Sequence, residues 1–325
     1  MRKLKIGILG TANIAIRSVI PALKLLPNQF ELIGVASRDG AKARKVAAEL
    51  HLEPFEQYEA ILDVSKIDVI YIPLPNSMHH QWVKIALNLG IHVLVEKSLG
   101  CSLEEVIFLN ILAKEKGLVL IENFQFRFHR QLSSIQALIK NDQIGELRCL
   151  RASFGFPPFK DKANIRYTEE LGGGALLDAA AYTTKISQIL LGNNLEVKGA
   201  TLNYQDGFLV DIWGGAYLEN PNSGIFSQVS FGFDHFYQCG IEIWGSKGRI
   251  RTNRLFTAPS DYKPIILLEK DHGSDQIEIE PDNHFVNMLL HLYQLIETKK
   301  GIMEEYSQNI DQSRLLSQIK IQAHG

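Results

Sequence analysis

The chain has 325 residues, of which 46% are hydrophobic, and its formal net charge is −2. This length and apolar content predict about two domains with a substantial core. The small net charge and the lack of any apolar stretch near ~20 residues argue against nucleic acid or a membrane as a partner.

Cysteine usage and the N-terminal segment predict the compartment. Cys101, Cys149 and Cys239 are far apart and form neither a CxxC pair nor a cluster with histidines. A disulfide framework, a zinc site or any other metal site is therefore not expected. The basic N-terminus leads into a short apolar run that contains Gly7 and Gly10, which is typical of a first strand and not of a signal peptide. We expect a cytoplasmic protein.

Short apolar runs alternate with helix-length segments over residues 1–122. Runs of Val, Ile and Leu without polar alternation predict strands that are buried on both faces. The expected strands are residues 5–9, 31–36, 68–72, 92–96 and 119–121, and the expected helices are residues 14–26, 41–50, 78–89 and 103–116. This alternation predicts an α/β fold, with a doubly wound parallel sheet that binds a dinucleotide.

The pattern changes over residues 123–325, where extended segments bounded by turn residues predominate. The expected strands are residues 146–156, 197–204, 210–217, 224–233, 238–244 and 265–269, and the expected helices are residues 132–140, 175–191, 285–299 and 310–323. Such a pattern predicts an α+β domain with a mostly antiparallel sheet. We assign substrate binding and oligomerisation to this second domain.

The first strand leads into a turn that is suited to a dinucleotide. Its residues are Gly10, Thr11, Ala12, Asn13, Ile14 and Ala15. The turn needs glycine at its start, and it needs small side chains where a pyrophosphate approaches the backbone and where the helix packs on the strand. An ordinary strand–turn–helix would also suit this hexapeptide, but its position at the start of the series favours a cofactor site.

The end of the second expected strand bears on the choice of cofactor. NAD enzymes usually place a carboxylate there to bind the ribose, whereas this chain has Ser37 and Arg38. A hydroxyl and a guanidinium suit a 2′-phosphate. The alternative is a solvated Arg38 with Asp39 at the ribose. The sequence therefore favours NADP over NAD.

Two further segments carry candidate catalytic residues. Lys97 directly follows the expected strand 92–96, and the carboxyl ends of strands face the ligand crevice in doubly wound folds. Asp178 and Tyr182 follow the glycines 172–174 and are four residues apart, so they lie on one face of the expected helix. On spacing alone, these two could equally be a local hydrogen-bonded pair.

Four motifs together resemble the Gfo/Idh/MocA oxidoreductase family (glucose–fructose oxidoreductase / inositol dehydrogenase-like). They are residues 10–15, 75–80, 96–97 and 172–182, and the resemblance spans nearly the whole chain. It implies a Rossmann domain followed by a domain with a large open sheet. The chain departs from the family at Ser98, where proline is usual, and at Ala180, where glycine is frequent.

The resemblance also implies roles for individual residues. Lys97 would contact substrate and assist proton transfer, Asp178 would bind substrate, and Tyr182 would replace the acid/base histidine of many members. The remaining residues at the cofactor cleft would be Pro75, Asn76, His79 and Glu96, together with Lys97.

A narrower resemblance is to the sugar-nucleotide 3-ketoreductases within this family. It rests on residues 154–157, 165–167 and 171–178, together with Tyr182. It implies that Tyr182 protonates the carbonyl oxygen of a keto sugar while a hydride is delivered, with Lys97 stabilising the charge. Further expected substrate contacts are Arg127, Phe156 and Arg166; the two arginines are candidate diphosphate contacts, although either could simply be solvated.

Two other functions remain open on the sequence. One is a dehydrogenase of a free sugar, a cyclitol or a trans-dihydrodiol, and the other is a non-catalytic NADP-binding regulator. The apolar, aromatic residues of 226–236 and 241–244 predict that another subunit covers the open sheet, which would give a homodimer or homotetramer.

Overall fold

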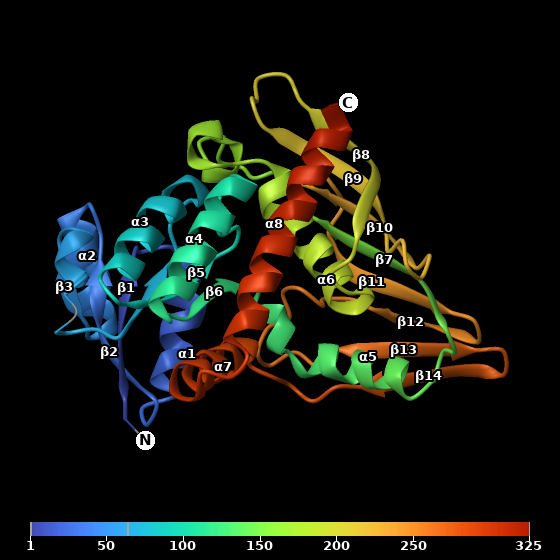
Figure 1. Cartoon of the computed structure of the whole chain (residues 1–325), viewed down its shortest axis with the longest axis horizontal. Helices are drawn as coiled ribbons and strands as arrows, with labels where there is room; N and C mark the ends of the chain where they lie inside the picture. Colours follow the sequence, from blue (N-terminus) through green and yellow to red (C-terminus); the bar gives the residue numbers. More distant parts are fainter. Residues whose placement is uncertain (1, 64, 325) are drawn as a thin grey trace. The chain divides into compact units, whose positions relative to one another are not determined.

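The computed structural model describes residues 2–63 and 65–324 (Figure 1). The chain forms two compact units. The first comprises the residues up to Asn123 together with Phe285–Ile310, and the second comprises Phe124–His284 together with the residues from Asp311 onward. The sequence pattern predicts a division into residues 1–122 and 123–325. In the structure, Asn123 and residues 285–310 also belong to the first unit.

In the described part of the first unit, a six-stranded parallel sheet has the order β3-β2-β1-β4-β5-β6. Its strands are β1 (Leu4–Leu9), β2 (Phe30–Ala36), β3 (Glu53–Phe55), β4 (Val69–Ile72), β5 (His92–Glu96) and β6 (Leu120–Asn123). The central strands are buried on both faces, which explains their continuous runs of Val, Ile and Leu. The predicted doubly wound sheet is therefore confirmed, and its order reverses between β1 and β4, where such sheets bind ligands.

Short helices connect these strands. They are η1 (Ala15–Val19), α1 (Ile20–Lys24), α2 (Gly40–Leu50), η2 (Glu59–Ile61), α3 (Asn76–Asn88) and α4 (Leu103–Lys116). The helix predicted over residues 14–26 is divided into a π-helical turn and α1. The division falls at Pro21, which stands at the start of α1 and has no backbone N–H for the helical ladder.

The first unit is completed by residues from the end of the chain. They come from α7 (His284–Thr298) and the first part of α8 (Ile302–His324). Tyr293 packs edge-on against Phe30, with ring centroids 5.8 Å apart. The side chain of Asn309 donates a hydrogen bond of 3.0 Å to the side chain of Asn110 on α4. These contacts explain why residues 285–310 belong with the parallel sheet, and α8 begins earlier than the predicted helix 310–323.

In the described residues of the second unit, an eight-stranded sheet has the order β14-β13-β12-β11-β7-β10-β9-β8. Its strands are β7 (Leu147–Gly155), β8 (Glu196–Tyr204), β9 (Asp211–Glu219), β10 (Phe226–Gly232), β11 (Gln238–Gly245), β12 (Gly248–Thr252), β13 (Ile265–Lys270) and β14 (Gly273–Glu278). β10 pairs with β7 in parallel and the other neighbours pair antiparallel, which confirms the predicted sheet.

Helices pack on one face of this sheet and build the core of the second unit. They are η3 (Gln125–Phe128), α5 (Arg130–Lys140), η4 (Ile165–Tyr167), η5 (Glu169–Leu171), η6 (Leu176–Ala180), α6 (Ala181–Leu191) and the second part of α8. α6 packs on β7 and β10. Leu150, Ile243 and Ile250 point into this core, whereas Arg151 and Glu242 lie on the other, more exposed face.

Candidate active site

The turn after β1 has the geometry that a bound pyrophosphate needs. Gly10 has φ +134°, and a Cβ there would lie 2.9 Å from Cδ2 of Leu74. A residue other than glycine would therefore be strained and would displace its neighbour. Beyond the turn, Thr11 and Ala15 are buried, whereas Ala12 and Ile14 are partly exposed and Asn13 is exposed. The small side chains leave the backbone of this turn open to a phosphate.

The residues after β2 fit a phosphate better than a ribose diol. The carboxylate of Asp39 accepts the N–H of Lys42 at 3.1 Å and caps α2. The hydroxyl of Ser37 accepts the N–H of Asp39 at 3.2 Å, and Ser37 is buried. Arg38 extends into solvent. A capping carboxylate beside an exposed guanidinium favours a cofactor that carries a 2′-phosphate.

The loop that carries Lys97 is fixed through its neighbour Ser98. The N–H of Ser98 donates to Oδ1 of Asn76 at 3.2 Å, and its carbonyl oxygen lies 2.7 Å from Nδ1 of His79. The other ring nitrogen of His79 lies 2.8 Å from the carbonyl oxygen of Leu74. The peptide bond between Lys97 and Ser98 is cis. Asn76 and His79 therefore hold the backbone beside Lys97.

His79 is one of the residues predicted at the cofactor cleft. Its side chain is fully buried, and burial lowers the pKa of the imidazole to about 4. Both ring nitrogens face backbone carbonyl oxygens, those of Ser98 and Leu74. His79 is thus a positioning residue for the loop. Pro75, which precedes α3 as its N-cap residue, remains partly exposed.

The carboxylate of Glu96 is also held by hydrogen bonds. One oxygen of its carboxylate accepts the hydroxyl of Tyr71 at 2.6 Å and the amide of Asn123 at 2.7 Å. Burial raises the pKa of Glu96, and these two hydrogen bonds and the charge of Lys97 partly offset that shift. Tyr71, Glu96 and Asn123 lie at or near the carboxyl ends of β4, β5 and β6. Their hydrogen bonds therefore fix the end of β5, which Lys97 follows.

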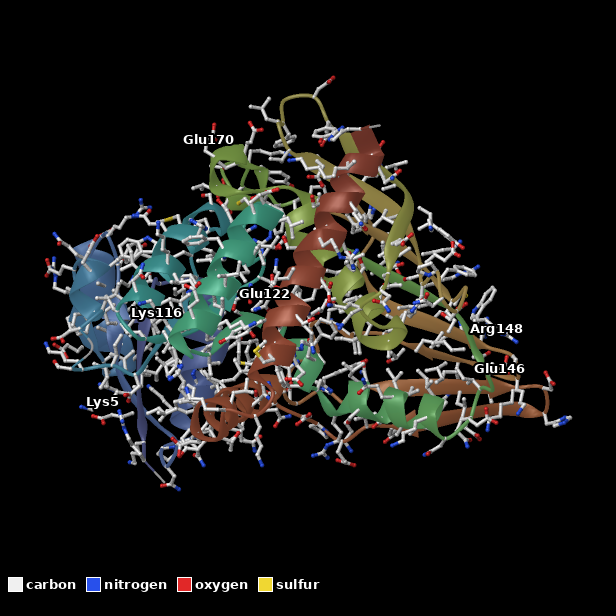
Figure 2. All side chains as sticks on the ribbon, in the orientation of Figure 1. Lys5, Lys116, Glu122, Glu146, Arg148 and Glu170 are labelled. Atoms are coloured by element: carbon white, nitrogen blue, oxygen red, sulfur yellow. The ribbon has the colours of Figure 1, made fainter. Side chains whose placement is uncertain are left out.

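The sequence did not identify Tyr71, Glu122 or Asn123 as part of this arrangement. Glu122, labelled in Figure 2, is buried, and its carboxylate accepts the N–H of Leu99 at 2.8 Å. A signal was available, because Glu122 and Asn123 are polar residues at the carboxyl end of a buried strand, like Lys97. Their partners could not be inferred without the order of the strands.

In the second unit, the glycines before the helix allow a close crossing of the chain. The N–H of Gly174 donates to the carbonyl oxygen of Arg166 at 2.9 Å. A Cβ on Gly173 would lie 2.6 Å from that same oxygen and 2.8 Å from the carbonyl oxygen of Thr168. The two segments can approach this closely because residue 173 has no side chain.

This crossing brings Arg166 and Asp178 together. Nε of Arg166 donates to the carboxylate of Asp178 at 2.7 Å, and the carboxylate side chain is 15% exposed. The charge of Asp178 is the main reason that the pKa of Arg166 is raised. The guanidinium also lies 5.0 Å from the ring centroid of Phe159. Two predicted substrate-binding residues thus form one charged pair.

Tyr182 is held by aromatic rings. It is 8% exposed, and its ring packs against those of Phe124, Phe126, Phe154 and Phe256 at centroid distances of 5.7, 5.9, 4.9 and 5.7 Å. The contacts with Phe124 and Phe154 are edge-on, and together the four rings fix the plane of the Tyr182 ring.

The two other predicted contacts are partly exposed. Phe156 stacks on Phe233 with centroids 5.2 Å apart, and the guanidinium of Arg127 lies 5.1 Å from the ring centroid of Phe128. Both residues therefore present part of their surface outside the core of the second unit.

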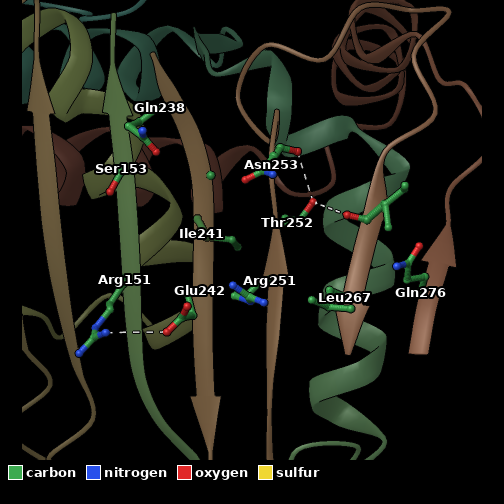
Figure 3. Close-up of a pocket in the computed structure, with 12 residues that line it drawn as sticks. Arg151, Ser153, Gln238, Ile241, Glu242, Arg251, Thr252, Asn253, Leu267 and Gln276 are labelled. Atoms are coloured by element: carbon green, nitrogen blue, oxygen red, sulfur yellow. Dashed lines mark hydrogen bonds and ion pairs between the residues drawn. The ribbon is translucent and has the colours of Figure 1, made fainter. Parts of the chain in front are cut away.

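A pocket of about 590 Å³ lies elsewhere, on the more exposed face of the second sheet (Figure 3). Its lining includes Arg151, Ser153, Glu242, Arg251 and Asn253, and it does not include Asp178 or Tyr182. Figure 3 shows the ion pair between Arg151 and Glu242 at its edge, with a distance of 3.8 Å. This hollow is therefore separate from the candidate active-site residues.

Within residues 2–63 and 65–324, no helix combines the length and hydropathy of a bilayer span, and no cluster of three or more His, Cys, Asp or Glu residues is arranged to hold a metal ion.

Comparisons with known proteins agree with this geometry. A profile described as an oxidoreductase family with an NAD-binding Rossmann fold matches residues 4–124, and the GFO/IDH/MocA C-terminal domain matches residues 132–251. The dTDP-3,4-didehydro-2,6-dideoxy-α-D-glucose 3-reductase of Streptomyces violaceoruber is 38% identical, over 85% of this chain and 80% of its own. The D-xylose 1-dehydrogenase (NADP⁺) 2 of Haloferax volcanii is 33% identical, over 83% and 80%.

A solved structure extends the match to nearly the full length. The 3-ketoreductase of Actinomadura kijaniata, in complex with NADP and TDP-benzene, is 33% identical and has a TM-score of 0.94, with 99% of this chain and 98% of that chain covered. Structures of the same protein with a lysine replaced by alanine and with a tyrosine replaced by phenylalanine also match. The expected family resemblance is confirmed: the chain belongs to the Gfo/Idh/MocA family of oxidoreductases.

Proposed function

We propose that the protein is an NADP-dependent ketoreductase that acts on the keto group of a sugar linked to a nucleoside diphosphate. The observation that carries this proposal is the arrangement of Arg166, Asp178 and Tyr182 in the second unit of a chain that matches sugar-nucleotide 3-reductases along most of its length. Lys97, at the end of a strand in the first unit, supplies the ammonium group. The lysine and tyrosine variants of the Actinomadura enzyme concern the same two residue types.

Each residue has a defined chemical task in this proposal. NADPH, when bound, supplies the hydride for the carbonyl carbon. The hydroxyl of Tyr182 donates a proton to the carbonyl oxygen, and the aromatic rings around it limit the directions in which that hydroxyl can point. The ammonium group of Lys97 stabilises the negative charge that develops on the oxygen.

Binding of the substrate follows from the Arg166–Asp178 pair. The carboxylate of Asp178 accepts a hydrogen bond from a sugar hydroxyl, and Arg166 orients that carboxylate. Because Nε of Arg166 is used for Asp178, its terminal nitrogens are the ones that contact the diphosphate, together with Arg127. The side chain of Phe156 contacts the sugar. These remote contacts orient the reacting carbon.

A second candidate is a dehydrogenase of a free sugar. The match to the D-xylose 1-dehydrogenase of Haloferax volcanii favours it, since that protein also covers most of this chain. The two candidates share the hydride chemistry and differ in whether a nucleotide contributes to binding. A regulator without catalytic activity is disfavoured by the presence of Lys97, Asp178 and Tyr182.

One assay separates these candidates. The consumption of NADPH is followed with a dTDP-linked 3-keto-deoxysugar, and the formation of NADPH is followed with xylose, glucose, myo-inositol and a trans-dihydrodiol. We expect turnover of the sugar nucleotide and little turnover of the others. Efficient oxidation of a free sugar, without binding of the sugar nucleotide, would replace the first candidate by the second. Cofactor binding without turnover of any substrate would favour the regulator.

We further propose that the protein works in the cytoplasm as a homodimer or homotetramer. Cys101, Cys149 and Cys239 are free thiols, which suits a reducing compartment. The more exposed face of the second sheet carries Trp244, 36% exposed, with the guanidinium of Arg151 4.0 Å from its ring centroid. Exposed tryptophan and arginine side chains are enriched at protein interfaces, which supports an assembly through this face.

A further inference from the structure

A buried carboxylate lies at the N-terminus of the helical segment that carries Asp178 and Tyr182. Asp211 is the first residue of β9 and is 8% exposed. Its Oδ2 accepts the backbone N–H of Leu176 at 2.6 Å. Its other oxygen fills the space where a Cβ of Gly174 would be, and Gly174 has φ +105°. The helix therefore begins in direct contact with the first residue of β9.

This contact acts on the turn that contains Asp178. The first N–H groups of a helix have no partner within the helix, and a carboxylate satisfies them while its charge interacts favourably with the helix dipole. The N–H of Asp178 donates to the carbonyl oxygen of Gly174 at 3.1 Å, so Asp178 belongs to the same turn. Tyr182 follows four residues later in the same continuous helical segment.

The turn is held from two sides. From one side, Arg166 binds Gly174 through its backbone and Asp178 through its side chain. From the other side, Asp211 binds Leu176, and Asp211 itself is fixed by its pairing with Tyr204 of β8. Arg166 lies in η4, a helical turn of three residues, whereas Asp211 belongs to the sheet. The sheet contact therefore provides the rigid reference for the position of the helix.

We propose that Asp211 is a positioning residue for the reduction, because its ionised carboxylate anchors the first turn of the helix and so fixes where Asp178 and Tyr182 lie. This inference rests on the proposed ketoreductase function for its kinetic consequence, but the anchoring itself does not depend on the identity of the substrate.

The charges around Asp211 make this anchor sensitive to pH. Burial raises the pKa of Asp211 to about 6, and the shift is reduced by the N–H groups of Leu176 and Ala175 and by the charge of Lys320 on α8. On β8, burial is the main reason that the pKa of the Tyr204 phenol is raised, and the charges of Asp211 and of Glu169 on η5 add to this shift. Below about pH 6 the carboxylate gains a proton, and a neutral carboxyl group is a weaker acceptor for the helix.

Activity and stability respond to this proton in opposite directions. The folded pKa of Asp211 lies above the ordinary value of 3.8, so the folded state binds the proton more tightly than the unfolded state. Between pH 6 and pH 4, the contribution of this group to the free energy of unfolding therefore increases as pH falls. The anchoring charge is lost over the same interval. A structural role alone would not separate the two effects.

The substitution Asp211→Asn tests the proposal, because asparagine has nearly the same shape and carries no charge. We expect kcat for ketoreduction near neutral pH to fall by about tenfold, as a small displacement of catalytic groups implies. The contribution of Asp211 to the acidic limb of the pH profile, near pH 6, should disappear. The Kd of NADPH and the melting temperature should not decrease. The matched control is Glu219→Gln, at the other end of β9, which should keep the rate and the pH profile.

A second measurement needs neither a variant nor a substrate. In the unmodified protein, amide hydrogen exchange of residues 175–178, corrected for the intrinsic effect of pH, should become less protected as pH falls through 6, and the carboxyl carbon of Asp211 should titrate there by NMR. Unchanged protection, or Asp211→Asn with the kcat and pH profile of the unmodified enzyme, would overturn the proposal. If no keto-sugar nucleotide is reduced, the proposed function fails while the exchange experiment still decides the anchoring.

Discussion

The hydroxyl of Tyr182 belongs to a side chain whose ring is already fixed by its neighbours. Replacement by phenylalanine keeps those ring contacts and removes the proton donor. Tyr182→Phe should therefore lower kcat for ketoreduction by roughly 10²–10⁴-fold, the range for loss of a general acid, with unchanged Kd for NADPH. Steady-state kinetics and cofactor titration measure the two effects.

Tyr217→Phe provides the control for this substitution. Tyr217 lies on β9 and stacks on Phe226 with centroids 5.1 Å apart, so it also loses a hydroxyl from a packed aromatic pair. The Tyr217→Phe variant should have the same kcat as the unmodified enzyme. Near-normal turnover of Tyr182→Phe would show that another group donates the proton.

Arg38 allows the choice of cofactor to be tested at one side chain. Its removal should leave the turn at Gly10 intact and take away a charged partner of the 2′-phosphate. Arg38→Ala should weaken NADPH binding by ~1.5–3 kcal/mol, the range for a hydrogen bond to a charged group, and leave the binding of NADH nearly unchanged. Isothermal titration calorimetry with both cofactors measures this difference.

Lys45→Ala, an exposed cation on α2, is the control for the loss of charge as such. Lys45→Ala should change the affinity for neither NADPH nor NADH appreciably. Equal weakening of NADPH and NADH in Arg38→Ala, or tighter binding of NADH by the unmodified protein, would contradict the assignment of the 2′-phosphate.

At the scale of elements, the close crossing at Gly173 has a measurable energetic consequence. A methyl group there would fall within 2.6 Å of a carbonyl oxygen, so the backbone must move. Gly173→Ala should lower the free energy of unfolding by about 1–3 kcal/mol, as overpacking does. It should also lower kcat, because Arg166 and Asp178 are joined across this crossing. Urea denaturation and kinetics measure the two quantities.

Gly199→Ala on β8 is the matched control. No heavy atom of the described chain lies within 4 Å of a Cβ at that position, and the residue lies in a strand. Its stability should stay the same or rise slightly. Similar losses in both variants would indicate that the crossing is less tightly packed than the distances imply.

Five of the six strands of the parallel sheet could be predicted because burial on both faces requires uninterrupted Val, Ile and Leu. β3, β12 and β14 were not predicted, since their sequences contain few apolar residues. β14 is mostly exposed, and in β12 Ile250 is the buried residue between Arg249 and Arg251. Their strand geometry follows from pairing with β11 and β13, and single-sequence patterns do not contain that information.

The candidate site was predictable to a similar extent. Lys97, Asp178 and Tyr182 could be identified from strand ends and helical spacing together with the family resemblance. The groups that orient them could not, because Glu122, Asn123 and Asp211 meet their partners only through the order of strands in the sheets. Asn76 and His79 were predicted at the cofactor cleft, and their contacts with the backbone of Ser98 could not be predicted from the sequence.

At the scale of the whole molecule, the exposed face of the second sheet predicts assembly. The unmodified protein should behave as a dimer or tetramer at micromolar concentration in multi-angle light scattering. Trp244→Lys should shift this equilibrium toward the monomer, because a lysine would replace an aromatic side chain that is 36% exposed on this face.

Ile321→Lys is the control, since Ile321 is 64% exposed on α8 and the substitution introduces the same charge. Its mass should equal that of the unmodified protein. A strictly monomeric mass for the unmodified protein would contradict the proposed assembly.

The composition of the first unit also constrains the order of events during synthesis. The ribosome produces the whole parallel sheet well before it produces residues 285–310, which complete that unit. While all of the second sheet is translated, Phe30 lacks its ring contact with Tyr293, and the side chain of Asn110 lacks its hydrogen bond with Asn309. The nascent nucleotide-binding half therefore has an unfinished surface throughout elongation. It reaches its final packing only near the time of release, which makes this surface a natural contact for chaperones that act at the ribosome.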